Sequence, residues 1–354
     1  MEQKLRYSMK KNKITAVITI LVIVTIILFC FYEEVISLDY LGQYKDTMNV
    51  TSIGHITNSR ANEVLNTNAH SNDKLKMCFI SNAGECALKS ISIDKVVNAE
   101  VIYVNGYINL LFPELKYEKD IDNGSCIIDM VTASKLYGHT DIIGMKLTVA
   151  NNNFVINDVI DSKQQFIIIS DKENRTLQYD QLCVNTDGKS SKLILNKLSV
   201  VYGIQGKIVC FRIIGFLPLC LLAVMLIISS VLLILKIRNI RLRFLSSKYR
   251  YWFYGTEFLI IIFVIVLMLI FIGEMCPVDL IPTLWSAFDE WDEIMESINS
   301  SFKVLFIKNM LFFEYSYVLQ LFKSIAFAFI TYILFLIFKN CIYKKVIYIF
   351  DLKL

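Results

Sequence analysis

Apolar residues in this chain are concentrated in four long blocks, and polar segments of very different length separate them. The first two blocks have uninterrupted runs without a charged residue, 14–32 and 213–235, whereas the third block carries Glu257 and the fourth carries Lys323, each near its start. A helix crosses about 30 Å of hydrocarbon with roughly 20 apolar residues, and a charged side chain near the end of a span can reach the interface. The pattern therefore predicts four transmembrane helices, over residues 14–32, 211–235, 252–273 and 317–338.

The first block follows a basic leader, residues 1–13, and must be distinguished from a secretory signal peptide. Its apolar run is longer than the usual core of a signal peptide. The sequence after it, "FYEEV", offers no small-residue cleavage site. We therefore expect a retained membrane anchor.

Lysine and arginine are distributed unequally between the segments that flank the blocks. The leader, the link at residues 236–251 and the tail at residues 339–354 are basic, whereas the link at residues 274–316 has many more acids than bases. Because basic flanks stay on the cytoplasmic side, we expect both termini in the cytoplasm, and residues 33–210 and 274–316 outside a cell membrane. The net charge of +4 hides this asymmetry. Since the basic residues lie beside the membrane, they predict contact with membrane lipid and no nucleic-acid partner.

The long polar segment at residues 33–210 contains short runs of β-branched and aromatic residues, bounded by Gly, Asn, Asp or Ser. Such runs are typical of strands; residues 151–153 predict a turn, and residues 131–137 predict a short helix ended by Gly138. The segment is long enough for its own core. We therefore expect an α-helical membrane protein with a large α+β extracytoplasmic domain inserted between the first and second spans. The predicted strands cover residues 76–80, 99–104, 126–130, 146–149, 154–159 and 166–169.

Motifs that would carry chemistry are missing from the sequence. The segment "GIQGKI" at Gly203 has neither the spacing nor the hydroxyl of a phosphate loop, and the serine-hydrolase and zinc-protease motifs do not occur. We expect no enzyme activity, no cofactor in this chain and no metal site, because the three histidines are scattered. Among nine cysteines, Cys78 and Cys86 bracket the predicted turn "FISNAGE". They are a candidate disulfide, with buried reduced thiols as the alternative.

The stretch "CIIDMVTASKLYGHTDIIGMKLTVANNNFVINDVID", residues 126–161, resembles the extracytoplasmic core domain of MacB/FtsX-type ABC transporter permeases. The matching positions are Ala133, Leu136, Tyr137, Gly138, Gly144, Phe154 and Val159. One glycine of the family pattern is Asp158 here. The resemblance implies a permease subunit that works as a homodimer or with a similar subunit. It also implies that ATP is hydrolysed by a separate ABC-type ATPase, and that the movement is transmitted to the outer domain for export or extraction of a peptide or lipid-linked cargo, or for control of an external partner.

The basic link at residues 236–251 also resembles this family, where it would be the coupling helix that contacts the ATPase. Leu242, Leu245 and Tyr249 recur on one face of a predicted helix. Basic residues, among them Arg241 and Lys248, occupy the rest. From the residues alone, a surface helix on anionic lipid is the favoured interpretation; the resemblance reverses this preference and favours the ATPase contact.

Glu257 takes the acidic place that the family has at the start of the third span. It is either solvated or paired with Arg250 or Lys248. The Glu-Ile-Gly usual before the turn is absent from this chain.

The acidic link at residues 274–316 carries a second apolar stripe at helical spacing, which predicts a helix that packs on the external domain or skims the interface. The stripe consists of Leu284, Phe288, Trp291 and Met295. A different class of function stays open as well. A membrane-anchored extracellular sensor, whose basic link recruits a cytoplasmic signalling partner, would have the same spans and the same sidedness.

Overall fold

The computed structural model describes residues 2–113, 115, 122–162, 164–243, 250–270, 277–281, 288–307 and 310–351. The chain divides into two compact units. The helical unit comprises Met1–Leu41, Gly215–Cys276 and Val318–Leu354, and the α+β unit comprises Gly42–Ile214 and Pro277–Tyr317. The α+β unit is therefore built from two separate stretches of chain, whereas the sequence predicted the single stretch at residues 33–210.

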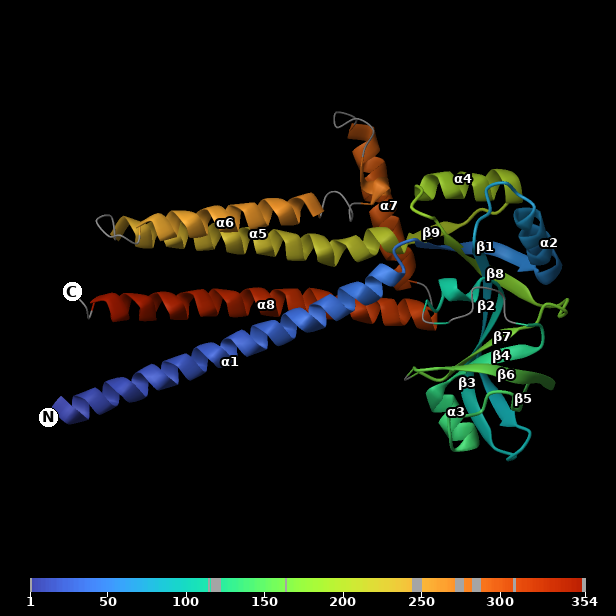
Figure 1. The fold of residues 1–354 in the computed structure, drawn as a ribbon. Helices are drawn as coiled ribbons and strands as arrows, with labels where there is room; N and C mark the ends of the chain where they lie inside the picture. Colours follow the sequence, from blue (N-terminus) through green and yellow to red (C-terminus); the bar gives the residue numbers. More distant parts are fainter. Residues whose placement is uncertain are drawn as a thin grey trace. The chain divides into compact units, whose positions relative to one another are not determined.

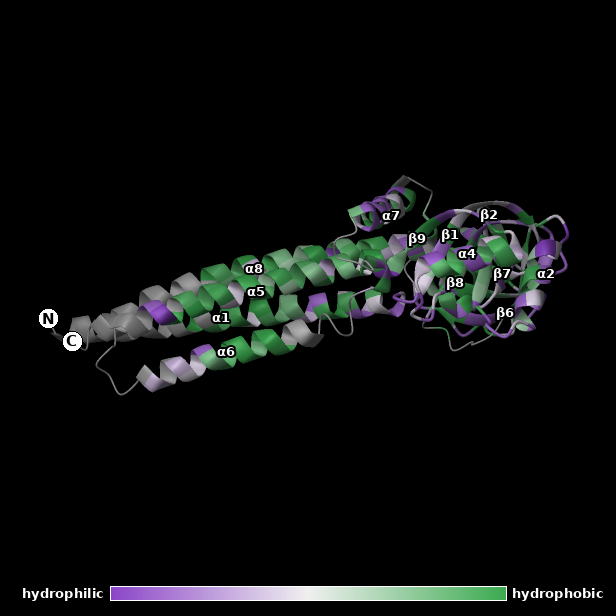
Figure 2. Ribbon diagram, turned by 90° about the horizontal axis from the view of Figure 1, so that it is seen from above, coloured by the Kyte–Doolittle hydropathy of each residue, from purple (hydrophilic) through white to green (hydrophobic). Residues whose placement is uncertain are grey.

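The helical unit consists of parts of four long helices (Figure 1), which are α1 Glu2–Gln43, α5 Phe211–Arg243, α6 Arg250–Ile270 and α8 Phe312–Asp351. Figure 2 shows that they are hydrophobic over most of their coloured length. Three stretches in α1, α5 and α8 are long and apolar enough to cross a membrane, namely Leu21–Gln43, Phe211–Asn239 and Phe313–Ile337. The described part of α6 holds a shorter apolar stretch, Tyr254–Val266. Three spans are thus supported by length and composition, and the fourth stays a prediction.

The α+β unit contains a nine-stranded sheet with helices packed on it (Figure 1). Its strands are β1 Thr47–Thr57, β2 Met77–Ser90, β3 Val96–Gly106, β4 Ser125–Asp129, β5 Lys146–Val149, β6 Asn152–Ile160, β7 Phe166–Ser170, β8 Gln178–Asn185 and β9 Lys207–Cys210. Its helices are α2 Asn58–Ala69, α3 Met130–Tyr137, α4 Ser191–Tyr202 and α7 Phe288–Ile307, with short 3₁₀ turns η1 Ile108–Leu110 and η3 Val278–Leu280. The α+β class predicted for this part of the chain is confirmed.

Strand β2 belongs to two parts of the sheet. The strand order is β3-β7-β4-β6-β5-β2-β8-β1-β9. Strands β2 and β3 also pair with each other, so the strands from β2 through β7 form a closed ring. The end of β2 pairs with β5, through Leu88 and its neighbours, whereas its beginning pairs with β8, through Met77 and its neighbours. Strand β2 is long enough to belong to both parts of the sheet, because its first half pairs with β8 and its second half pairs with β5.

Each part of the sheet has its own core. One cluster of buried residues packs α3 against the ring, with Leu136, Phe154 and Ile167 at its centre. A second cluster packs α2 and α4 against β1, β2 and β8, with Phe79 and Leu198 fully buried in it. The split follows position along β2, because its beginning contributes Met77 and Phe79 to the second cluster and its end contributes Leu88 to the first.

Helix α3 begins and ends where the sequence indicates. The carboxylate of Asp129, the N-cap, accepts hydrogen bonds from the backbone N–H of Thr132 at 2.9 Å and of Phe166 at 3.0 Å. Burial raises the pKa of Asp129, and these hydrogen bonds oppose that shift. Gly138 ends the helix with φ of 79°, the left-handed conformation that glycine adopts without strain. The predicted helix is confirmed, with Met130 in its first turn and not in the preceding strand.

Candidate functional site

Four aromatic side chains gather where three of the long helices meet the α+β unit along the chain. Tyr44 directly follows α1, Phe211 is the first residue of α5, and Phe313 and Tyr317 lie in the first turns of α8. All four are at most 2% exposed. We call them the junction cluster, and all four belong to the α+β unit.

The rings of the junction cluster contact one another directly. The centroids of Phe211 and Tyr317 are 4.8 Å apart and those of Tyr44 and Tyr317 are 5.8 Å apart, both edge to face. Tyr44 stacks on Phe313 at 6.2 Å. Such aromatic pairs contribute about 0.5–1.5 kcal/mol each beyond the burial of their area. Residues from three distant parts of the sequence therefore form one packed group.

Hydrogen bonds fix the orientation of the two tyrosines. The hydroxyl of Tyr317 donates to the backbone oxygen of Phe211 at 2.8 Å, which joins the start of α8 to the start of α5. The hydroxyl of Tyr44 donates to the backbone oxygen of Leu111 at 3.0 Å, just after η1. Both hydroxyls are buried and both are satisfied, so the cluster has one defined arrangement.

The buried carboxylate of Glu314 links α8 to the sheet by hydrogen bonding. Glu314 is 2% exposed and accepts a 2.6 Å hydrogen bond from the side-chain amide of Asn49, on β1. The same amide reaches the side-chain oxygen of Gln181, on β8, at 3.3 Å. Glu314 also accepts the backbone N–H of Leu311 at 2.9 Å, which is the capping contact that begins α8. The helix start and two central strands thus share one polar network.

Cys183, on β8, lies close to this network. Burial raises the pKa of its thiol, and the charge of Glu314 adds to the shift. Its sulfur is 4.0 Å from the backbone oxygen of Leu110. A thiol held in its neutral form here is a packing group and not a nucleophile.

The segment after α6 is attached to α4. The carboxylate of Asp279, on η3, accepts the hydroxyl of Ser190 at 2.8 Å, the backbone N–H of Ser191 at 2.8 Å and the hydroxyl of Ser191 at 3.0 Å. These groups begin α4, whose N-cap Ser190 has no cap hydrogen bond from its own side chain. A residue remote in sequence therefore caps this helix.

Helix α7 contacts β9, so the helix predicted in this link packs on the α+β unit. The predicted stripe is not the packing face, however. Phe288 is 78% and Met295 62% exposed, whereas Ile294, Ser301 and Leu305 are buried. These three recur at i, i+7 and i+11, one face of a helix rotated from the predicted one. Of the stripe's other members, Trp291 is only part-buried, and Leu284 lies outside the described residues.

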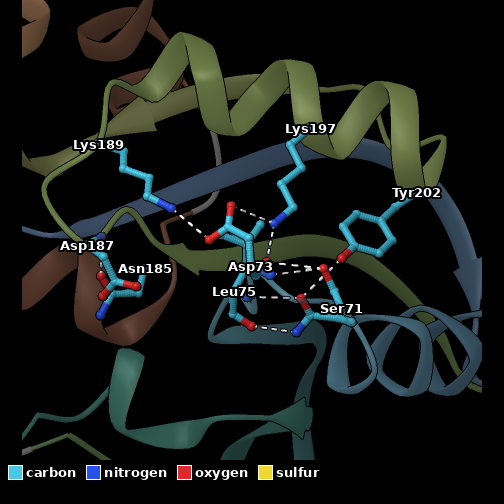
Figure 3. A network of polar contacts seen from close by, with 9 residues as sticks. Ser71, Asp73, Leu75, Asn185, Asp187, Lys189, Lys197 and Tyr202 are labelled. Atoms are coloured by element: carbon cyan, nitrogen blue, oxygen red, sulfur yellow. Dashed lines mark hydrogen bonds and ion pairs between the residues drawn. The ribbon is translucent and has the colours of Figure 1, made fainter.

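A second polar network joins the end of α2 to α4 (Figure 3). Asp73 forms ion pairs with Lys189 at 2.8 Å and with Lys197 at 3.1 Å. The hydrogen bonds from Lys189 and Lys197 hold the pKa of Asp73 below its ordinary value. Nearby, the side-chain oxygen of Asn68 accepts the hydroxyl of Tyr202 at 3.1 Å. This network stabilises the packing of α2 and the segment after it on α4.

The residues that carry the family resemblance are mostly core residues. Ala133, Leu136, Tyr137 and Phe154 are buried in the cluster around α3, and Val159 packs against it. Gly138 and Gly144 have φ of 79° and 85°, which favours glycine. Five of the seven residues thus lie in or against one core, and the two glycines have backbone conformations that favour glycine.

The predicted coupling residues lie largely outside the described residues. Leu245, Lys248 and Tyr249 are not described, and Arg241 and Leu242 lie in the last turn of α5. Glu257 lies in the second turn of α6. Its predicted pairing with Arg250 or Lys248 stays a prediction.

The disulfide predicted between Cys78 and Cys86 is wrong. Both residues are reduced, and both lie on strand β2. At about 3.3 Å per residue, eight residues of extended strand place them roughly 26 Å apart, whereas a disulfide requires Cα atoms within about 7 Å. The stretch between them, read as a turn, contains only a bulge between Asn82 and Gly84.

Within the part of the chain that the structure describes, no cluster of three or more His, Cys, Asp or Glu is placed to hold a metal ion. The junction cluster was missed in the sequence, although a signal for it exists. Phe211 begins the second predicted span and Phe313 lies shortly before the fourth, and aromatic residues at such borders are typical of membrane interfaces.

No family model matches this chain, and a search of curated proteins found no match. Three solved structures are similar to part of it. The periplasmic region of MacB from Actinobacillus actinomycetemcomitans is 12% identical with a TM-score of 0.37, and the similarity covers 46% of this chain and 87% of that chain. The extracellular domain of the noncanonic ABC-type transporter YknZ from Gram-positive bacteria is 13% identical with a TM-score of 0.32, covering 46% and 97%. A domain of a permease protein from Porphyromonas gingivalis is 14% identical with a TM-score of 0.32, covering 46% and 84%. Because identities and TM-scores are this low, the function is argued from the residues of the chain itself.

Proposed function

We propose that this chain is the permease subunit of an ABC-type transporter complex, and that it transmits the movement of a partner ATPase through its long helices to its α+β unit. The junction cluster is the observation that carries this proposal. In it, residues at the end of α1 and at the starts of α5 and α8 contact one another through aromatic rings. Two buried hydrogen bonds join Tyr317 to Phe211 and Tyr44 to Leu111, next to the sheet.

Transmission of movement requires that the helix ends be rigidly attached to the α+β unit. A helix that meets a domain through a flexible loop can move without moving the domain. Here α8 is fastened to β1 through Glu314 and Asn49, and to α5 through Tyr317. Close-packed interiors transmit displacement and switch between discrete arrangements. A shift of these helix ends would therefore be passed to strands β1 and β8.

The energy source would be a separate subunit. The sequence has no phosphate loop, and the basic link at residues 236–251, which resembles the family's coupling helix, would contact the ATPase. The complex would contain two copies of this chain or one copy and a similar permease. The α+β unit would face the outside and act on a peptide or lipid-linked cargo, or on an external partner.

Affinity purification of the full-length chain from its native membranes tests the partner. We expect an ABC-type ATPase to co-purify, identified by mass spectrometry and by vanadate-sensitive ATP hydrolysis. Leu245→Asp places a charge on the apolar face of the predicted coupling helix and should remove the ATPase. Leu193→Asp, on the exposed face of α4 where Leu193 is 63% exposed, is the matched control and should leave the ATPase bound.

Hydrogen exchange in the purified complex tests the transmission. Trapping with ATP and vanadate should change the exchange of β1 and β8. Tyr317→Phe removes only the hydroxyl that joins α8 to α5 and should reduce this change, whereas Tyr315→Phe, at an exposed neighbouring position, should not. A histidine kinase in place of an ATPase among the co-purifying proteins would support the sensor alternative and contradict the permease proposal.

A further inference from the structure

Helix α7 exposes a stripe of large apolar side chains that its packing on the α+β unit does not use. Phe288 is 78% exposed, Met295 62% and Phe306 44%. Trp291 and Phe302 are part-buried, and the rings of Phe302 and Phe306 stack with their centroids 6.2 Å apart. These five residues recur at i, i+3, i+7, i+14 and i+18, which is one face of a helix. We call them the exposed stripe.

Acidic residues occupy a different face of the same helix, and Figure 2 shows hydrophobic and hydrophilic residues together along α7. Because successive residues of a helix are rotated by about 100°, this acidic face lies on one side of the exposed stripe. The packing face, through Ile294 and Leu305, lies on the other side. Helix α7 therefore has one face packed on protein, one apolar face and one charged face. The exposed residues of the acidic face are Asp289, Asp292, Glu293 and Glu296.

Both attachments of α7 lead directly to a helix that is long and apolar enough to cross a membrane. At its end, residues 308–311 join α7 to α8, a link of at most roughly 18 Å, and the apolar stretch Phe313–Ile337 begins there. On its packing side, α7 contacts β9, which continues without an intervening residue into α5 and the apolar stretch Phe211–Asn239. Helix α7 is therefore held at the end of the α+β unit where the chain enters the membrane.

We propose that α7 lies flat in the membrane interface on the side of the α+β unit, with the exposed stripe in lipid and the acidic face in water. Aromatic residues are favoured at this depth, and an amphipathic helix of this kind buries its apolar face about 5–10 Å into the boundary between headgroups and acyl chains. Lipid fits the stripe better than a second copy of the chain does. In a symmetric contact the same face meets itself, so the acidic residues of both copies would be brought together.

The proposed contact is apolar and does not require anionic lipid, because the charged face of α7 is acidic. It rests on α5 and α8 crossing the membrane, and it is independent of the transport function proposed above. Its test therefore uses the chain without an ATPase, so that failure of one proposal does not decide the other.

Quenching of tryptophan fluorescence in the full-length chain, reconstituted in lipid nanodiscs, tests the proposal. Trp252→Phe and Trp285→Phe together leave Trp291, in the exposed stripe, as the sole tryptophan. Lipid brominated on the upper part of its acyl chains should lower the fluorescence of Trp291 roughly twofold, because the ring lies at the depth of the bromines. Iodide, which stays in water, should have little effect on it.

Two further probes in the same background, each combined with Trp291→Phe, complete the design. Phe288→Trp places the probe at the most exposed position of the stripe, and brominated lipid should quench it as well. Ser300→Trp is the matched control on the acidic side, because Ser300 is exposed and follows Glu293 and Glu296 at helical spacing. Iodide should quench this probe, and brominated lipid should not.

Size-exclusion chromatography checks that each variant is folded. Equal quenching of the stripe probes and the Ser300→Trp probe by brominated lipid would overturn the proposal, and so would quenching of the stripe probes by iodide. Stripe probes that neither quencher reaches would overturn it as well, since protein, such as a second copy of the chain, would then cover the stripe.

Discussion

The side-chain amide of Asn49 donates a 2.6 Å hydrogen bond to the buried carboxylate of Glu314. The two residues are 265 positions apart in the sequence, one on β1 and the other in the first turn of α8. The same carboxylate also accepts the backbone N–H of Leu311. Glu314 therefore both caps the N-terminus of α8 and attaches this helix to the sheet. This contact is a direct polar link between a long helix and the β structure.

Glu314→Ala should lower the stability of the full-length chain. The substitution leaves two buried donors, the amide of Asn49 and the N–H of Leu311, without their shared acceptor, at a cost of about 1–3 kcal/mol. Thermal unfolding of the purified chain in detergent measures it. Glu293→Ala is the control, because Glu293 is 61% exposed in a surface ion pair with Lys192 and such pairs contribute about 0–1 kcal/mol. An equal effect of the two substitutions would contradict the structural role of Glu314.

Asp279→Ala should loosen the start of α4. It removes the acceptor of three hydrogen bonds from Ser190 and Ser191, and loss of an N-cap costs about 0.5–2 kcal/mol. Hydrogen exchange of the first turn of α4 should become faster, with little change in α2. Asp289→Ala, in the first turn of α7, serves as the control. If the exchange of α4 does not respond, Asp279 is not its cap in solution.

The regular elements of the α+β unit were largely predictable from the sequence. The runs beginning at Lys76 and Ala99 lie in β2 and β3, and the four later predicted strands correspond to β4, β5, β6 and β7. The turn predicted at residues 151–153 lies one residue earlier. Ala150 and Asn151 join β5 to β6, with φ of 47° and 71°, as in a tight hairpin, and Asn152 and Asn153 belong to β6. Local patterns succeed here because each element carries its own alternation and its own turn residues.

Elements defined by distant partners were not predictable. Strand β1, with "TMNVTSIGHIT", is polar at positions such as Asn49 and Thr51, and both are buried only because β8, β9 and α8 supply partners. The cap of α4 comes from Asp279, 88 residues away. The residues next to these positions in the sequence do not indicate such long-range contacts.

Asp73 should make stability depend on pH in the acid range. Hydrogen bonds from Lys189 and Lys197 lower the pKa of Asp73 in the folded chain, so its contribution is present above the unfolded pKa, about 3.9. That contribution is lost as the pH falls through the folded pKa. Asp73→Asn should therefore lower Tm slightly at neutral pH, and the difference from wild type should vanish at acid pH.

Thermal unfolding of the full-length chain between about pH 2.5 and 7 measures this difference on both sides of the carboxyl's ordinary pKa. Asp187→Asn is the matched control. Asp187 lies near Asp73 in Figure 3, has a φ of 48° that Asn also tolerates, and forms no ion pair among the described residues. A difference that grew on acidification for Asp73→Asn would contradict the ion pairs with Lys189 and Lys197.

Cys78 and Cys183 face each other directly across β2 and β8, yet we expect both to stay reduced. The thiolate is the reactive form, and burial raises the pKa of Cys183; it also raises that of Cys126, to about 12. Maleimide labelling of the native full-length chain, followed by mass spectrometry, should modify half-buried Cys86 first and these three buried thiols only after unfolding. A peptide joining Cys78 to Cys86 would contradict the assignment of β2 as one continuous strand. A peptide joining Cys78 to Cys183 would agree with the register of β2 on β8 and contradict the expected inertness of the pair.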